Sequence, residues 1–161
     1  MNKENLIKLL ESVKNNEINI DSAVDKLKEL PFTDLDYALI DNHRQIRTGF
    51  PEVIYCAGKT PEQVKGIIEY MLKGDKNILA TRATKEMFDL VKEIYPKANY
   101  NVLGRTITIK KEEMKETESY ILVMSAGTSD LPVVEEAYET AKILRTRVEK
   151  IGDVGIAEIN R

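Results

Sequence analysis

The chain has a single cysteine, a single histidine and few long apolar runs among its 161 residues. Cys56 alone cannot form a disulfide within the chain, and a cysteine-based metal site is excluded within one copy. A membrane helix needs roughly 18 consecutive apolar residues, and no stretch of this sequence reaches that length. Charged residues interrupt the apolar pattern of residues 1–16, which is unlike a secretory signal, so we expect a cytoplasmic protein.

The chain also has little net charge. The formal charge is −3, with 32% charged and 42% hydrophobic residues. Disordered proteins combine fewer apolar residues with more net charge, so this composition predicts a globular protein with a real core. A general nucleic-acid binder usually concentrates basic residues on one face, and the balanced charge argues against that class. We therefore expect neither nucleic acid nor membrane as a partner.

The apolar spacing predicts an α/β fold. Residues 1–30 have the pattern of two short helices, with Asp21 or Ser22 as the expected N-cap of the second. Thr60 and Pro61 are expected to begin a helix. Its buried stripe would consist of Val64, Ile67, Ile68 and Met71. Further helices are expected at residues 83–96 and 131–148, and β-prone runs at residues 31–41, 52–58, 78–82, 100–109 and 120–124. Because helices and strands alternate from residue 60, a largely parallel sheet is favoured.

The sequence CAGKT, residues 56–60, resembles the end of a phosphate-binding P-loop. The full motif needs a glycine where Val53 stands, so we do not expect a nucleoside triphosphate site here. Cys56 lies in a β-prone run, and Lys59 is the nearby cation. These neighbours predict a small buried core residue rather than a reactive thiol.

The histidine, His43, lies beside Arg44 and close to Arg47. It lacks neighbouring ligands with the spacing of a metal site, and we expect no metal there. Arg44 and Arg47 could share one anionic ligand, because guanidinium groups make bidentate contacts to phosphate and carboxylate. An ordinary structural role is the alternative for this pair.

The most informative stretch is SAGTSD, residues 125–130, which follows the apolar run ILVM. A buried strand is expected to end there, and Ser129 or Asp130 would cap the next helix. Backbone N–H groups at a helix N-terminus bind anions, and α/β folds place ligands at the carboxyl ends of parallel strands. We therefore predict a phosphate- or nucleotide-binding loop, with a plain capped turn as the alternative. The expected contacts are Ser125, Gly127, Thr128, Ser129 and Asp130.

The sequence VMSAGTSDLPVVEEAYETA, followed by DVGIAEINR, resembles the nickel-pincer cofactor biosynthesis carboxylase/hydrolase family, LarB. The catalytic domain of that family is related to the aminoimidazole ribonucleotide carboxylases, PurE. DNHRQIRTGFPEVIYCAGKTPEQV and ILATRAT also resemble the N-terminal region of the family. With this resemblance, we expect N-terminal helices at residues 1–30 and a mixed α/β domain at residues 31–118. Residues 119–161 would form the first strand–helix–strand of a doubly wound, PurE-like parallel sheet.

The resemblance implies a reaction. Nicotinic acid adenine dinucleotide would be carboxylated by carbon dioxide on its pyridinium ring, and its phosphoanhydride hydrolysed with release of AMP. The product would be a pyridinium biscarboxylic acid mononucleotide. A family cysteine adds to the ring as a covalent nucleophile, and Mg²⁺ is a reasonable helper for the hydrolysis. The resemblance also implies a homo-oligomer.

Several positions depart from the family pattern. The loop residues match, and Arg161 matches a phosphate-binding arginine. Asn160 stands where the family has histidine, and Glu158 where it has glycine. Asparagine cannot shuttle a proton at neutral pH. Cys56 does not match the family nucleophile, which is expected beyond Arg161, so we expect a truncated chain that is inactive by itself. The alternatives are a non-catalytic nucleotide-binding or assembly module and an aminoimidazole ribonucleotide carboxylase or mutase.

Overall fold

The computed structural model describes residues 3–28, 32–34, 39–41, 52–111 and 117–155. The chain divides into two compact units, Met1–Glu52 and Val53–Arg161, and each is considered by itself. The domain boundaries expected after residues 30 and 118 stay predictions. No helix in the described ranges is long and apolar enough to span a membrane.

The first unit contains the two helices expected from residues 1–30. Helices α1 (Lys3–Lys14) and α2 (Ile20–Lys28) each place one buried apolar residue, Leu9 and Ala23. The predicted N-cap of α2 was wrong. The backbone N–H of Ser22 donates to the side-chain oxygen of Asn19 over 2.7 Å, so the cap lies before the two predicted positions. Two short strands, β1 (Phe32–Asp34) and β2 (Leu39–Asp41), form an antiparallel pair.

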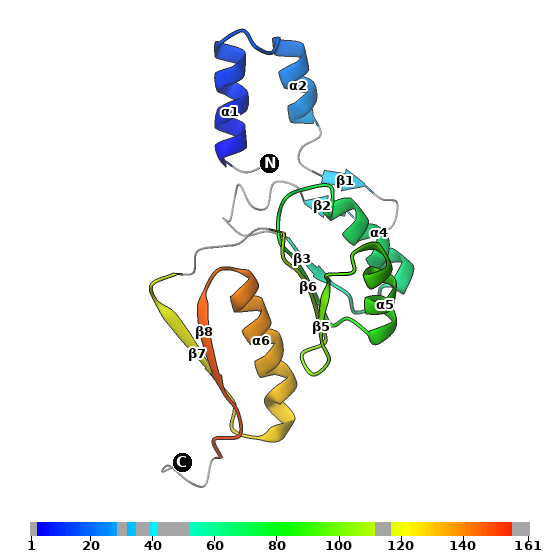
Figure 1. Ribbon diagram of the computed structural model, residues 1–161, viewed down its shortest axis with the longest axis vertical. Coiled ribbons are helices and arrows are strands. Elements are labelled where there is room, and N and C mark those ends of the chain that lie inside the picture. Colours follow the sequence, from blue (N-terminus) through cyan, green and yellow to red (C-terminus); the bar gives the residue numbers. More distant parts are fainter. Residues whose placement is uncertain (1–2, 29–31, 35–38, 42–51, 112–116, 156–161) are drawn as a thin grey trace. The chain divides into compact units, whose positions relative to one another are not determined.

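The second unit is built on a four-stranded sheet with the order β3-β4-β6-β5 (Figure 1). Its strands are β3 (Val53–Tyr55), β4 (Ile78–Thr81), β5 (Asn99–Asn101) and β6 (Thr106–Ile109). The α/β class is confirmed, but the expectation of a largely parallel sheet was wrong. Strand β6 is antiparallel to both of its neighbours, whereas β3, β4 and β5 share one direction. The turn between β5 and β6 is too short for a parallel crossover, so β6 must run antiparallel to β5.

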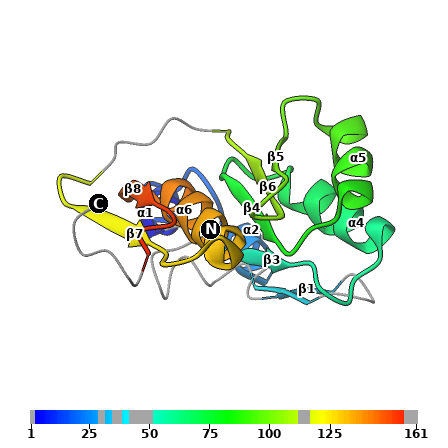
Figure 2. The same cartoon turned by 90° about the horizontal axis from the view of Figure 1, so that it is seen from below.

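Helices α4 (Pro61–Met71) and α5 (Lys85–Ile94) lie on one side of this sheet (Figure 2). Thr60 caps α4, as the sequence predicts, and it forms a capping box with Gln63. Of the predicted stripe, Met71 is half-buried and the other three residues are buried. Strands and helices meet in an apolar core, where Phe88 of α5 stacks on Tyr100 of β5 with ring centroids 5.1 Å apart.

The opposite face of the sheet is covered by α6 (Leu131–Ile143) and has a different composition. The side chain of Asn101 contacts α6, and Asn101 pairs with Thr106 in the strand register. By alternation along and across the strands, Thr106, Thr108 and Thr81 share this face. All three threonines are buried, and the hydroxyl of Thr106 has no hydrogen-bond partner among the described residues.

A separate parallel pair, β7 (Tyr120–Met124) and β8 (Arg147–Ile151), packs against α6. The helix predicted to reach residue 148 ends at Ile143. Arg145 adopts a left-handed φ of 74°, which stops the helix, and the residues from Arg147 form β8 instead.

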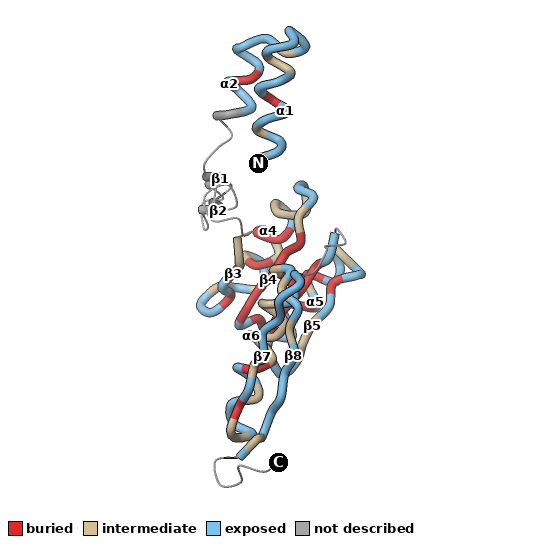
Figure 3. Tube along the Cα trace, turned by 90° about the vertical axis from the view of Figure 1, so that its left-hand side faces the viewer, coloured by how far each residue is buried: buried red, intermediate tan, exposed pale blue. Residues whose placement is uncertain are grey.

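Strand β7 was predicted to be buried, and this expectation was wrong for the described structure. Ile121, Leu122 and Met124 are 45%, 44% and 55% exposed, and Figure 3 shows most of β7 and β8 as exposed. The reason is the small size of this sheet. It has only two strands, so α6 covers part of it and side chains on both faces meet solvent.

Candidate nucleotide-binding loop

The predicted loop, residues 125–130, joins the carboxyl end of β7 to the start of α6. Backbone hydrogen bonds attach its first residues to the segment that follows β8. Ser125 donates to the carbonyl of Ile151 over 3.1 Å, and Val154 donates to the carbonyl of Ser125 over 3.1 Å. Gly155 donates to Ala126 over 3.0 Å. The first residues of the loop are therefore held at the carboxyl edge of a parallel strand pair, where α/β folds place ligands.

The exposed part of the loop is a single 3-10 turn, Thr128–Asp130. Asp130 stands at the N-cap position of α6, yet its carboxylate makes no capping hydrogen bond and its backbone is helical, with φ −90° and ψ −10°. The alternative role of Asp130 as the side-chain cap of this helix is therefore wrong. A carboxylate at the positive end of the α6 dipole is still electrostatically favourable.

Ser125 differs from the other loop residues because it is buried, with 6% exposure. Its hydroxyl has no hydrogen-bond partner among the described residues. A buried polar group without a partner costs about 1–3 kcal/mol. Ser125 also lines a cavity of about 280 Å³ together with Asp130. The other lining residues are mostly apolar: Val123, Met124, Ala126, Val133, Val134 and Ala137.

Gly127 has extended backbone angles, φ −130° and ψ 164°, which any residue adopts. A Cβ atom there would meet only the Ser129 hydroxyl, at 3.9 Å, so the space beside the glycine is open. Sequence reasoning missed Gly152. A Cβ atom at Gly152 would lie 2.4 Å from a methyl group of Leu131 and 3.7 Å from the Ser125 hydroxyl. Its backbone thus runs close to the loop, which no local pattern indicates.

Five predicted positions lie outside the described residues, and their contributions stay predictions. They are Arg44, Arg47, Glu158, Asn160 and Arg161.

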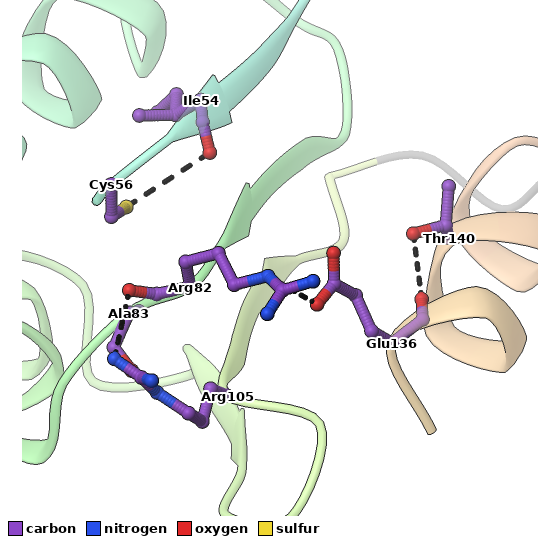
Figure 4. Close-up of polar contacts among 7 residues, drawn as sticks. All are labelled: Ile54, Cys56, Arg82, Ala83, Arg105, Glu136 and Thr140. Carbon is purple, nitrogen blue, oxygen red and sulfur yellow. Dashed lines mark hydrogen bonds and ion pairs between the residues drawn. The ribbon is translucent and has the colours of Figure 1, made fainter. Parts of the chain in front are cut away.

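Cys56 is confirmed as a buried core residue, with no exposed surface. Its thiol lies 3.9 Å from the carbonyl of Ile54 (Figure 4). Burial raises the pKa of Cys56 from 9.0 to about 11, and the positive charge of Lys59 offsets only part of this rise. The Lys59 ammonium donates to the carbonyl of Tyr55 over 2.9 Å. The thiol therefore stays protonated at neutral pH.

We expect Cys56 to resist alkylation in the folded chain. At pH values below 9 it should react roughly a hundredfold more slowly than in denaturant, because a pKa higher by about two units removes that much thiolate. Iodoacetamide labelling followed by mass spectrometry measures both rates. Between pH 9.0 and about 11 the unfolded thiol ionises while the folded thiol does not, so stability should fall as pH rises through this window. Equal rates in the two states would contradict the buried position.

Comparison with known proteins identifies the family. Residues 32–113 match the family model of the LarB/PurE-like N-terminal domain, which is half of the chain. The chain belongs to the LarB/PurE-like family. This is a carboxylase-type family associated with cofactor biosynthesis.

The matched residues of the LarB/PurE-like domain end before the loop. A relative carries the similarity further: an uncharacterised protein of Methanocaldococcus jannaschii is 34% identical over 169 aligned residues. The alignment covers 98% of this chain and 64% of the relative. The chain thus spans less than two thirds of the length of this relative.

The described residues of the loop in this LarB/PurE-like chain do not form a magnesium site by themselves. Within the described ranges, no group of three or more His, Cys, Asp or Glu side chains could hold a metal. Magnesium is usually held by one or two carboxylates together with substrate phosphates and water, and Asp130 is the one carboxylate that lines the cavity. A magnesium ion for the hydrolysis step stays a prediction.

Proposed function

We propose that the chain takes part in synthesis of pyridinium-3,5-biscarboxylic acid mononucleotide. In this reaction nicotinic acid adenine dinucleotide is carboxylated with carbon dioxide and its phosphoanhydride is hydrolysed, releasing AMP. The observation that supports the proposal most directly is the Ser125 hydroxyl, which is buried without a partner beside Asp130 in one cavity. Membership of the LarB/PurE-like family supports the reaction class.

The loop would hold the phosphoribosyl part of the substrate. The Ser125 hydroxyl can donate to a phosphate oxygen, and so can the hydroxyls of Thr128 and Ser129 at the positive end of the α6 dipole. The carboxylate of Asp130 would repel a phosphate at close range, and it can instead accept a hydrogen bond from a ribose hydroxyl. Arg161 is proposed as a further phosphate contact, and the pair Arg44 and Arg47 as an anion contact of the first unit, considered by itself.

The apolar part of the cavity suits a flat ring system, because Val123, Val133 and Ala137 offer no polar atoms from their side chains. Covalent addition to the pyridinium ring requires a thiolate, and the buried, protonated Cys56 does not supply one. We therefore propose that the described residues bind and orient the nucleotide and do not supply the nucleophile. We also propose that the protein acts as a homo-oligomer.

Calorimetry with nicotinic acid adenine dinucleotide tests the loop. Asp130→Ala is expected to weaken binding about tenfold, because a hydrogen bond to a charged group is lost. Asp75→Ala is the matched control, since it removes an equal charge from an exposed carboxylate, 76% exposed, outside the loop. Wild-type binding no tighter than that of Asp130→Ala would reduce the loop to a simple turn.

Turnover is tested separately by incorporation of labelled carbon dioxide and by chromatography of released AMP. Incorporation with AMP release supports the proposed reaction. Binding with neither product would support the alternative of a non-catalytic nucleotide-binding module. Carboxylation of an aminoimidazole ribonucleotide in place of the dinucleotide would support the mutase-like alternative.

A further inference from the structure

We infer that Arg82 is a positioning residue for the nucleotide loop. It lies at the end of β4 in the N-terminal domain and acts through Glu136 of α6, the helix that begins at the loop. This inference rests on the proposed nucleotide-binding role of the loop. Its consequence is that the domain matched by the family model helps to set the geometry of a binding loop outside the match.

The backbone of Arg82 is held in an unusual conformation. Arg82 and Arg105 both have left-handed φ angles, 56° and 51°, which non-glycine residues rarely adopt. Three hydrogen bonds hold this segment of the backbone. Ala83 donates its N–H to the carbonyl of Arg105 over 2.8 Å. The Arg105 guanidinium donates back to the carbonyls of Ala83 and Arg82, each over 3.4 Å. These hydrogen bonds therefore hold the backbone from which the Arg82 side chain extends.

From this point Arg82 reaches α6. Its Nε atom lies 2.8 Å from a carboxylate oxygen of Glu136 (Figure 4), and the Glu136 side chain is 23% exposed. Glu136 follows Asp130 by six residues, which places the ion pair roughly 9 Å from the loop along the helix axis. A helix moves as a stiff element over this length. A shift of α6 at Glu136 therefore moves the loop residues that line the cavity.

The neighbouring residue, Glu135, anchors the same turn of α6 from two sides. Asn101 of the β5–β6 hairpin donates to Glu135 over 2.7 Å, and Lys150 of β8 forms an ion pair with it. Asn101 is itself oriented by the N–H of Gly104, over 2.8 Å. Burial raises the pKa of Glu135, but the hydrogen bonds from Lys150 and Asn101 and the charge of Lys150 outweigh it, so the pKa lies below its usual value. Glu135 thus holds this turn of α6 to the β5–β6 hairpin and to β8, and the ion pair of Glu136 with Arg82 holds the same turn to the end of β4.

The test compares Arg82→Gln, Glu136→Gln and the double variant in the full chain. The first readout is amide hydrogen exchange of residues 125–131 without ligand, and the second is the Kd of nicotinic acid adenine dinucleotide. Each single variant is expected to speed exchange of the loop and to raise the Kd about fivefold. The double variant should do no more than either single one, because both remove the same contact. Arg82→Lys, which keeps the charge, should restore part of the affinity.

Lys85→Gln is the control, since it removes another exposed ion pair, with Asp89, within α5. It should change neither readout. Additive effects of the two substitutions, or loop exchange equal to that of the control, would overturn the inference. If the wild-type chain does not bind the dinucleotide, the proposed function fails. The exchange measurement then still decides whether Arg82 and Glu136 order the loop.

Discussion

Replacing Ile68 by alanine is expected to lower the free energy of unfolding of the second unit by about 2–5 kcal/mol. Ile68 lies on the inner face of α4 with no exposed surface, and it is among the largest fully buried side chains described. Truncation removes its contacts and leaves a cavity that the close-packed isoleucines of the sheet can fill only in part. Denaturant unfolding followed by circular dichroism measures the change.

Two further variants calibrate the result. Ile68→Val should cost about 0.5–1.5 kcal/mol, because it removes one methylene and keeps the shape. Val102→Ala, at a position 74% exposed in the β5–β6 turn, should change stability by less than about 0.5 kcal/mol. An unfolding midpoint for Ile68→Ala equal to that of Val102→Ala would mean that the inner face of α4 is not in the core.

Alanine at Gly104 is expected to destabilise the packing of α6 on the sheet by about 1–3 kcal/mol. The added Cβ atom would lie 2.9 Å from the backbone nitrogen of Glu136 and 3.0 Å from atoms of Glu135. Two of these are backbone atoms of a helix, so relief requires α6 or the hairpin to move as a whole. The same movement would lengthen the contacts of Asn101 with Glu135 and of Arg82 with Glu136.

Thermal unfolding and hydrogen exchange of α6 measure this effect. Gly74→Ala is the control, because its added Cβ atom would lie at an ordinary distance, 3.5 Å, from the carbonyl of Met71. We expect faster exchange in α6 for Gly104→Ala and unchanged exchange for Gly74→Ala. If the two variants behave alike, the close approach of the hairpin to α6 does not contribute to the packing of α6 on the sheet.

Features encoded within a few residues were predicted well from the sequence. The start of α4 is an example, since Thr60 and Pro61 were enough to predict it, and Gln63 completes the capping box. The cap of α2 was missed because Asn19, Asp21 and Ser22 are all good capping residues. Which of them caps the helix depends on where the preceding turn ends, and residue type alone does not show this. The end of α6 was missed because the polar and apolar residues after Ile143 continue a helical pattern, whereas the left-handed Arg145 breaks it.

Contacts between distant parts of the chain could not be predicted in this way. Apolar composition indicated a buried β7, but burial depends on what lies against a strand rather than on the strand itself. The pairing of β6 between β4 and β5 is likewise set by the sheet as a whole. For the candidate site, the loop was proposed from a short local pattern, the run SAGTSD directly after the apolar residues ILVM. The contact of Arg82 with Glu136 and the close approach at Gly104 join residues that no short motif connects.

The threonines under α6 have a consequence for how the second unit opens. Lifting α4 or α5 would expose isoleucines, and water offers those side chains nothing in return. Lifting α6 would expose Thr81, Thr106 and Thr108, whose hydroxyls water can hydrogen-bond, including the Thr106 hydroxyl that has no partner among the described residues. The two faces of one sheet thus differ in how readily they are wetted. The more easily wetted face lies under α6, the helix that begins at the loop proposed to hold the nucleotide.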